Sequence, residues 1–170
     1  MRFSLLPKIV ANSLTELSPS FLKSRNISLL MLDFDNTIVP YTTNEPTAEM
    51  LSWLEMLLES DISLCVVSNS RKDRVKDFCD RYGLACIRRA KKPFSKGIKA
   101  CMAEFEAQPD TCALAGDQIY TDVLGANCAG VQSILVRSIH NHTFWLKLRH
   151  VAEMPFIIAA RKRRIHHEEH

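Results

Sequence analysis

Two acidic side chains at the end of an apolar run are the residues of this chain best suited to chemistry. Asp33 and Asp35 belong to the segment Leu29 to Thr37, in which an apolar stretch leads into Asp-Phe-Asp-Asn-Thr. An apolar run followed by Asn36 and Pro40 predicts a fully buried parallel strand that ends in a turn. Ligands of open α/β sheets bind at the carboxyl ends of such strands. Because two neighbouring carboxylates repel one another unless a cation or shared proton offsets their charge, we expect a bound Mg²⁺ here.

Polar residues also follow the other apolar segments that could form strands. In chain order they are Ser68 and Asn69 after residues 62–67, Lys92 after residues 85–87, and Asp117 after residues 112–115, with Asp122 five positions further on. In a parallel sheet the carboxyl ends of the strands share one edge, so we expect these side chains to converge.

A phosphomonoester is the substrate that this set of residues fits. Asp33 is placed to act as the nucleophile that takes the phosphoryl group. Asp35 can protonate the leaving oxygen and later deprotonate the attacking water. Lys92 would neutralise phosphate charge, while Ser68 and the amide of Asn69 would donate hydrogen bonds to phosphate oxygens.

The same strand ends offer the hard oxygen ligands that Mg²⁺ prefers. We expect the ion to be held by a carboxylate oxygen of Asp33, the main-chain carbonyl of Asp35, the carboxylate of Asp117 and waters. The sequence leaves open whether Asp122 contacts the metal or only orients the phosphate-binding lysine, and Lys91 is an alternative for the role of that lysine.

Helical patterns alternate with the predicted strands. The five strands are expected at Leu29 to Phe34, Ile62 to Val67, Ala85 to Ile87, Cys112 to Ala115 and Gln132 to Val136. The helices are expected to begin after Pro46-Thr47, at Ser70-x-x-Asp73 with a stop at Gly83, at Ser95, and at Tyr120. This alternation predicts an α/β fold with a mostly parallel five-stranded sheet between helical layers. The loop from Asp35 to Pro46 is too short for a cap domain, so the site should be open.

Four of these segments together resemble the motifs of the haloacid dehalogenase (HAD) superfamily of phosphatases. They are Asp33-Phe34-Asp35-Asn36-Thr37, Ser68, Lys92-Pro93 and Gly116-Asp117-x-x-x-x-Asp122. Their details, Asp-Asn-Thr, Val-Ser-Asn, Lys-Pro and Gly-Asp-Gln-x-x-Thr-Asp, are similar to the capless YqeG-like branch of subclass III A, which includes phosphatidylglycerophosphate phosphatases. The resemblance covers residues 29 to 136. It implies a Rossmann-like three-layer fold, Mg²⁺ dependence, an aspartyl-phosphate intermediate and a lipid phosphate substrate. One departure is Ser70, where relatives often have Asn, and it bears on substrate preference.

The composition fits one domain over residues 1–170, with 46% hydrophobic and 24% charged residues. We expect a core at 29–136, an N-terminal helical segment at 1–28 and a basic amphipathic segment at 137–170. No apolar stretch approaches the ~20 residues that span a bilayer, and the start of the chain is too briefly apolar for a secretory signal. We therefore expect a cytoplasmic protein. The six cysteines lack a C-x-x-C pair and are expected to be buried thiols.

The ends of the chain are more basic than its middle. Residues 1–28 hold four Lys or Arg against one acid, residues 29–136 eleven against fifteen, and residues 137–165 seven against one. This asymmetry indicates an anionic partner surface, either membrane or nucleic acid, with a solvated helix face as the alternative. We expect Phe144 to Val151 to pack on the core and Met154 to Arg164 to bind a membrane surface, which would place the protein peripherally at its inner face.

The leading hypothesis is a Mg²⁺-dependent phosphomonoesterase acting on a lipid headgroup phosphate such as that of phosphatidylglycerophosphate. One alternative is a phosphatase of soluble metabolites, nucleotides or phosphoproteins, in which a neighbouring subunit of a homo-oligomer covers the open site. Another is an RNA-binding or assembly factor with a vestigial site, although the complete acid pair argues against it. No DNA partner is expected. The lack of a Gly-rich phosphate loop argues against a nucleotide-driven kinase or a dinucleotide enzyme.

Overall fold

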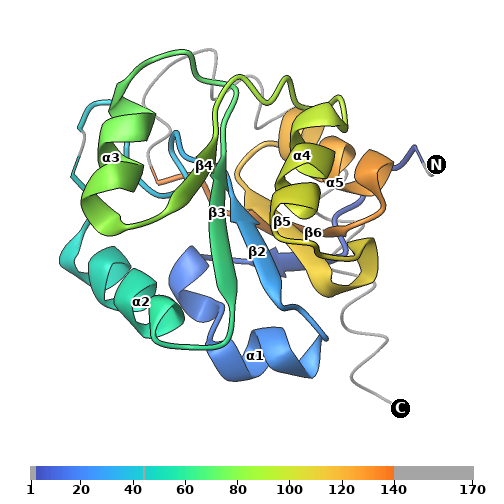
Figure 1. Cartoon of the computed structure of the whole chain (residues 1–170), viewed down its shortest axis with the longest axis horizontal. Coiled ribbons are helices and arrows are strands. Elements are labelled where there is room, and N and C mark those ends of the chain that lie inside the picture. The colour runs from blue at the N-terminus through green and yellow to red at the C-terminus, as the bar shows by residue number, and fades with distance from the viewer. Residues whose placement is uncertain (1–2, 44, 140–170) are drawn as a thin grey trace.

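Six parallel strands form the centre of the computed structural model, which describes residues 3–43 and 45–139. In chain order these strands are β1 (Ile9–Ala11), β2 (Leu29–Leu32), β3 (Ser63–Val67), β4 (Ala85–Ile87), β5 (Cys112–Gly116) and β6 (Gln132–Val136). Within the described residues their spatial order is β1-β6-β5-β2-β3-β4 (Figure 1). The strand that carries the acid pair therefore lies inside the sheet, with β5 on one side and β3 on the other.

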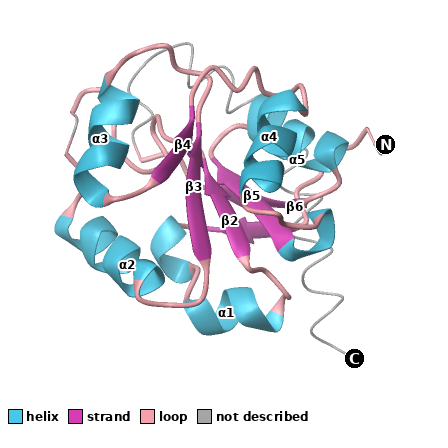
Figure 2. Ribbon diagram, in the orientation of Figure 1, coloured by secondary structure: helices cyan, strands magenta, loops and turns pink. Residues whose placement is uncertain are grey.

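The helices cover both faces of the sheet (Figure 2). They are α1 (Pro19–Ser24), α2 (Ala48–Leu58), α3 (Arg74–Tyr82), α4 (Lys96–Glu104) and α5 (Leu124–Ala129), with short 3₁₀ turns η1 (Leu14–Glu16) and η2 (Pro109–Thr111) and a π turn η3 (Ile119–Val123). Side chains of a strand alternate between the two faces. Leu30 and Leu32 accordingly pack with the α2 and α3 side, while Leu29 and Met31 pack with the α4 and α5 side. This two-sided burial explains the unbroken apolar sequence of β2.

The strand register brings the expected site residues to one edge. Leu32 pairs with Val66 of β3 and with Ala115 of β5, so the chain leaves all three strands at the same level. The N–H of Asp33 continues the ladder by donating to the Ala115 carbonyl at 2.8 Å. The residues that follow β2 therefore enter the site directly from a strand whose position is fixed by its neighbours.

The helix ends explain how the connecting loops are set. Thr47 caps α2 by accepting a hydrogen bond from the Met50 N–H, as the Pro-Thr entry predicts. Gly83 ends α3 with φ of +66°, a conformation that favours glycine. The start of α3 differs from expectation: it begins at Arg74 because Ser70 is held in a turn, where its N–H bonds the Ser68 hydroxyl.

The prediction of five strands is wrong by one, because β1 adds an edge strand beside β6. The segment before β2 contains this strand together with η1 and α1. Three residues are too few to show a periodic pattern, and β1 is fixed by pairing with β6 rather than by its own sequence. The expected amphipathic segment beyond residue 139 lies outside the described residues. In the described part of the chain, no helix has the length and apolarity to cross a membrane.

Candidate active site

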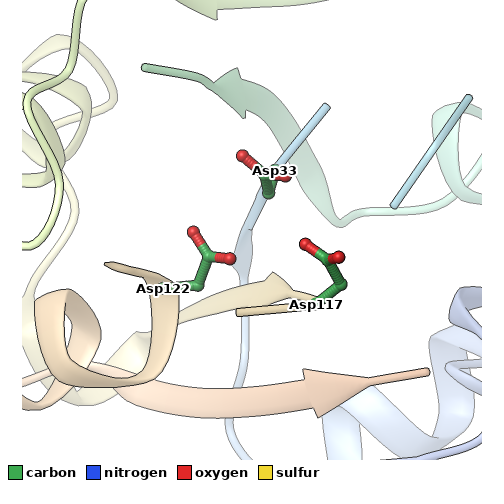
Figure 3. Close-up of side chains that lie close together, drawn as sticks. All are labelled: Asp33, Asp117 and Asp122. Carbon is green, nitrogen blue, oxygen red and sulfur yellow. The ribbon is translucent and has the colours of Figure 1, made fainter. Parts of the chain in front are cut away.

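Three buried carboxylates meet at the carboxyl edge of the sheet. Asp33 follows β2, Asp117 follows β5, and Asp122 comes from the π turn η3. Each offers an oxygen, and these oxygens lie within 4.8 Å of one another (Figure 3). Their exposed fractions are 6%, 6% and 1%. The structure therefore brings together acids that are far apart in sequence and withdraws all of them from water.

Lys92 joins two of these acids. Its Nζ lies 2.7 Å from Asp33 Oδ1 and 2.7 Å from Asp122 Oδ1, and its side chain is 1% exposed. Burial alone would lower the pKa of the ammonium, but the charges of Asp122 and Asp33 outweigh burial and raise the pKa of Lys92. The lysine therefore remains a cation next to Asp33.

Lys92 carries one positive charge, whereas the cluster contains three carboxyl groups. Burial raises the pKa of Asp33 from its ordinary value of 3.8 to about 7; Lys92 opposes the shift, and the charges of Asp122 and Asp117 add to it. A carboxyl group in this state holds a proton near neutral pH unless another positive charge approaches. Crowded, buried oxygen ligands with excess negative charge fit a divalent cation.

Asp122 is held from two sides by the protein. One oxygen pairs with Lys92, and the other accepts a hydrogen bond from the Gln118 N–H at 3.1 Å. A Cβ on Gly116 would lie 2.3 Å from this second oxygen, so no larger residue fits there without displacing Asp122. These contacts favour a role for Asp122 in orienting the lysine.

Asp117 is positioned by a residue that the sequence did not single out. Ser138, just after β6, donates from Oγ to Asp117 Oδ2 at 2.5 Å, and its hydroxyl accepts from Asn36 Nδ2 at 2.6 Å. Thr37 similarly donates to Asp33 Oδ2 at 3.3 Å. The first loop and the end of β6 therefore orient the acids through hydroxyl groups.

A cavity of about 310 Å³ lies next to Thr37 and Ser138. Thr37 and Ser138 line it, together with Ser13, Met50 and Arg137. Its volume is at the lower end of the range for small-molecule pockets. Thr37 and Ser138 therefore line this cavity and also contact the acids.

The side chain of Asp35 pairs with α3 and is not a member of the cluster formed by Asp33, Asp117 and Asp122. Its Oδ1 pairs with a guanidinium nitrogen of Arg74, the first residue of α3. Arg74 also lies over the ring of Phe34, 5.1 Å from its centroid, and donates to the carbonyls of Tyr41 at 3.3 Å and Thr43 at 3.4 Å. Arg74 was missed because a first-turn arginine has no distinctive spacing, and its distance from Asp35 depends on the crossover from β3 to α3.

Ser68 and Asn69 lie at the end of β3, next to the backbone that carries Lys92. Ser68 is 1% exposed, and its hydroxyl accepts from the Ser70 N–H at 3.0 Å. The Asn69 side chain bonds the Lys92 backbone twice, accepting from its N–H at 2.7 Å and donating to its carbonyl at 2.9 Å. Asn69 therefore fixes the position of the lysine, and its main-chain amide is the group left for the predicted phosphate contact.

Comparison with known proteins agrees with this arrangement. The HAD-hydrolase-like family model matches residues 89–151. The chain is 34% identical over 131 residues to the probable phosphatase YqeG of Bacillus subtilis, a match that covers 77% of this chain and 76% of the relative.

The chain belongs to the YqeG-like phosphatases of the HAD superfamily.

Solved HAD structures share the fold. A HAD-superfamily hydrolase from Ehrlichia chaffeensis has a TM-score of 0.57 at 14% identity, covering 77% of this chain and 98% of its own. A putative subfamily III A hydrolase from Legionella pneumophila has a TM-score of 0.55 at 13% identity, covering 75% and 72%. The cobalt-bound deoxy-D-mannose-octulosonate 8-phosphate phosphatase of Haemophilus influenzae has a TM-score of 0.55 at 14% identity, covering 82% and 92%. The Rossmann-like fold of the HAD family is thereby confirmed for this chain, and its class of reaction is phosphate ester hydrolysis.

Proposed function

We propose that this HAD phosphatase is a Mg²⁺-dependent phosphomonoesterase that forms an aspartyl-phosphate on Asp33 and acts on a phosphate carried by a phospholipid headgroup, such as that of phosphatidylglycerophosphate. The observation that carries the chemistry is the buried pair of Asp33 and Lys92, with Nζ 2.7 Å from the carboxylate. A lysine held there places a positive charge beside the atom that would attack phosphorus.

The reaction would proceed in two steps, phosphoryl transfer to Asp33 and hydrolysis of the aspartyl-phosphate. An oxygen of Asp33 attacks phosphorus while the bond from phosphorus to the leaving oxygen breaks, and Asp35 supplies the proton that the leaving oxygen needs. Water then attacks the aspartyl-phosphate, Asp35 takes a proton from that water, and the phosphorus bond to Asp33 breaks. Arg74 would orient the carboxyl group of Asp35 for both proton transfers.

Asp33, Asp117 and the main-chain carbonyl of Asp35 are the groups that would hold Mg²⁺. The three buried carboxyl groups, whose oxygens lie within 4.8 Å of one another, support this assignment. When bound, the ion would supply positive charge for the phosphate and keep Asp33 ionised. Asp122 would orient Lys92, while Ser68 and the main-chain amide of Asn69 would donate to phosphate oxygens.

The open edge of the sheet supports a substrate held at a surface. Residues 33–47 alone separate β2 from α2, and residues 68–73 alone separate β3 from α3, so neither connection holds a cap domain. A phosphate projecting from a lipid layer could reach such a site without entering a closed chamber. The intact set of acids and lysine argues against a vestigial site in an RNA-binding factor.

The test is a comparison of phosphate release from phosphatidylglycerophosphate in mixed micelles with release from glycerol 3-phosphate and p-nitrophenyl phosphate, with Mg²⁺ and with EDTA. We expect Mg²⁺-dependent turnover and a higher kcat/KM for the lipid. Asp33→Asn should reduce turnover by at least about 10³-fold, whereas the exposed Asp61→Asn should not. Equal activity of Asp33→Asn would reject the mechanism. A higher kcat/KM for a soluble ester would reject the lipid substrate and favour a soluble metabolite.

A further inference from the structure

Three exposed aromatic side chains lie on three different loops at the carboxyl edge of the sheet. Tyr41, Phe94 and Tyr120 are 45%, 73% and 40% exposed. Tyr41 lies in the loop between β2 and α2, Phe94 lies in the loop between β4 and α4, and Tyr120 belongs to η3 after β5. Single exposed apolar residues are ordinary on a protein surface, so these three matter because they share one edge of the sheet with the active site.

Each of these aromatic residues is next to a residue of the active site. The Tyr41 carbonyl accepts from Arg74, which pairs with Asp35. Phe94 is two residues beyond Lys92, and Tyr120 lies between Asp117 and Asp122 in the sequence. The aromatic residues therefore belong to the same three connections that carry active-site residues at the carboxyl edge of the sheet.

Cations flank the most exposed of these aromatics. Arg89, Lys91 and Lys96 are all exposed, and within the described residues none of the three takes part in an ion pair, whereas neighbouring Arg88 pairs with Asp73 at 2.8 Å. From Arg88 to Lys99 the chain has no acidic residue. This part of the edge therefore presents uncompensated positive charge.

The backbone conformation of the loop between β4 and α4 keeps the side chains of Arg89 and Lys91 at the surface. Arg89 and Lys91 have φ of +54° and +57°, a region that L residues rarely adopt. Ala90 between them is 3% exposed, its N–H donates to the Ser68 carbonyl at 3.0 Å, and a Cβ on Gly97 would lie 2.6 Å from Ala90 backbone atoms. The buried alanine anchors the loop, so its two basic neighbours are held at the surface.

We propose that Tyr41, Phe94, Tyr120, Arg89, Lys91 and Lys96 form an aromatic–cationic rim that docks the enzyme on a bilayer containing anionic lipids. The proposal rests on the proposed lipid substrate, and it adds the surface that brings the site to that substrate. Aromatic rings favour the boundary between headgroups and acyl chains, and nearby Lys and Arg attract anionic headgroups. Single-stranded RNA also binds to aromatic and basic side chains, and the experiment below distinguishes it from a bilayer.

Vesicle sedimentation tests the rim without relying on turnover. The full chain carrying Asp33→Asn would be mixed with phosphatidylcholine vesicles with or without phosphatidylglycerol. We expect binding only to the anionic vesicles and loss of binding at high salt. Adding Arg89→Gln and Lys91→Gln should weaken binding by about 25-fold, at roughly fivefold for each cation. Adding Tyr41→Ser, Phe94→Ser and Tyr120→Ser should weaken it by at least about tenfold.

Matched controls lie at the opposite edge of the sheet. Met56 and Leu58 are 40% and 45% exposed at the end of α2, and Lys23 and Arg25 lie at the end of α1, before β2 begins (Figure 1). Met56→Ser with Leu58→Ser, and Lys23→Gln with Arg25→Gln, should leave vesicle binding unchanged. Thermal unfolding of each variant would establish that it is folded.

The results separate the rim from the proposed substrate. Rim variants that bind vesicles like the parent protein would overturn the docking surface even if phosphatidylglycerophosphate is hydrolysed in micelles. Vesicle binding that depends on the rim, without hydrolysis of any lipid phosphate, would support the docking surface and overturn the proposed lipid substrate. Salt-dependent binding to single-stranded RNA in place of vesicles would also overturn the docking proposal.

Discussion

Replacing Lys92 with methionine should destabilise the protein more than most single substitutions. The ammonium is 2.7 Å from both Asp33 and Asp122. The side chains of Lys92, Asp33 and Asp122 are 1%, 8% and 1% exposed. Removing one partner of a buried ion pair costs about 3–5 kcal/mol because the remaining charge is left without compensation. Methionine preserves most of the volume, so the loss reports charge and not a cavity. We expect the free energy of unfolding to fall by about 3–5 kcal/mol at pH 8 in EDTA.

The loss should depend on pH in a defined direction. In the wild type, burial raises the pKa of Asp33 to about 7, and Lys92 acts against that rise. Without Lys92 the pKa of Asp33 must therefore rise further, and the variant will take up a proton at a higher pH than the wild type. Because each pKa unit corresponds to about 1.36 kcal/mol, the cost of Lys92→Met should shrink measurably between pH 8 and pH 6.

Urea denaturation followed by circular dichroism would measure both effects. Lys96→Met is the matched control, because Lys96 is exposed four residues away, and its effect should stay within about 0.5 kcal/mol. Adding Asp122→Asn to Lys92→Met should recover part of the loss, since it removes one unpaired acid. A loss below about 1 kcal/mol for Lys92→Met at pH 8, with the fold intact, would refute the claim that Lys92 compensates the buried acids.

Three further substitutions test other contacts of the site. Burial raises the pKa of Asp33 from 3.8 to about 7, so the metal-free wild type should lose up to about 4 kcal/mol of stability as pH rises from about 4 to 7. Asp33→Asn should lack that loss. Urea unfolding at both pH values in EDTA measures the difference. Arg74→Gln should lower kcat/KM by about 10²-fold because Asp35 loses the guanidinium that orients it. Arg74→Lys should restore little of that activity, because lysine lacks the planar fork of arginine. A pH profile of kcat/KM distinguishes the loss of this contact from misfolding. Ser138→Ala should weaken divalent-metal binding by about 10–100-fold by freeing Asp117, as measured by calorimetry, and unchanged affinity would contradict the contact's role.

The sequence predicted the strands that carry the acids because burial on two faces imposes a recognisable composition. The residues of β2 are apolar throughout and all buried, and the polar residues that follow β2, β4 and β5 lie at one edge because the strands are parallel. This reasoning predicts Asp33, Lys92 and Asp117 as residues of one site. Their convergence follows from the direction of the strands and not from local sequence.

Other contacts depend on geometry that spacing does not encode. Ser138 meets Asp117 because β6 lies beside β5, and Arg74 meets Asp35 because α3 starts four residues later than its capping-box-like signal suggests. The three residues of β1 carry no period and gain their structure from β6. In each case the decisive partner is distant in sequence, so residue type alone leaves the contact undetermined.

The lysine at the centre of the site is fixed from both of its ends before any substrate arrives. Asn69 holds its backbone through two hydrogen bonds, and Asp33 and Asp122 hold its ammonium. Asp122 can occupy its place only because residue 116 is glycine. A charge that is already oriented needs no reorganisation when negative charge develops on the phosphoryl group, and this is the main source of electrostatic catalysis. The Gly-Asp motif thus serves the site twice, through the acid of Asp117 and through the space that Gly116 leaves for the partner of Lys92.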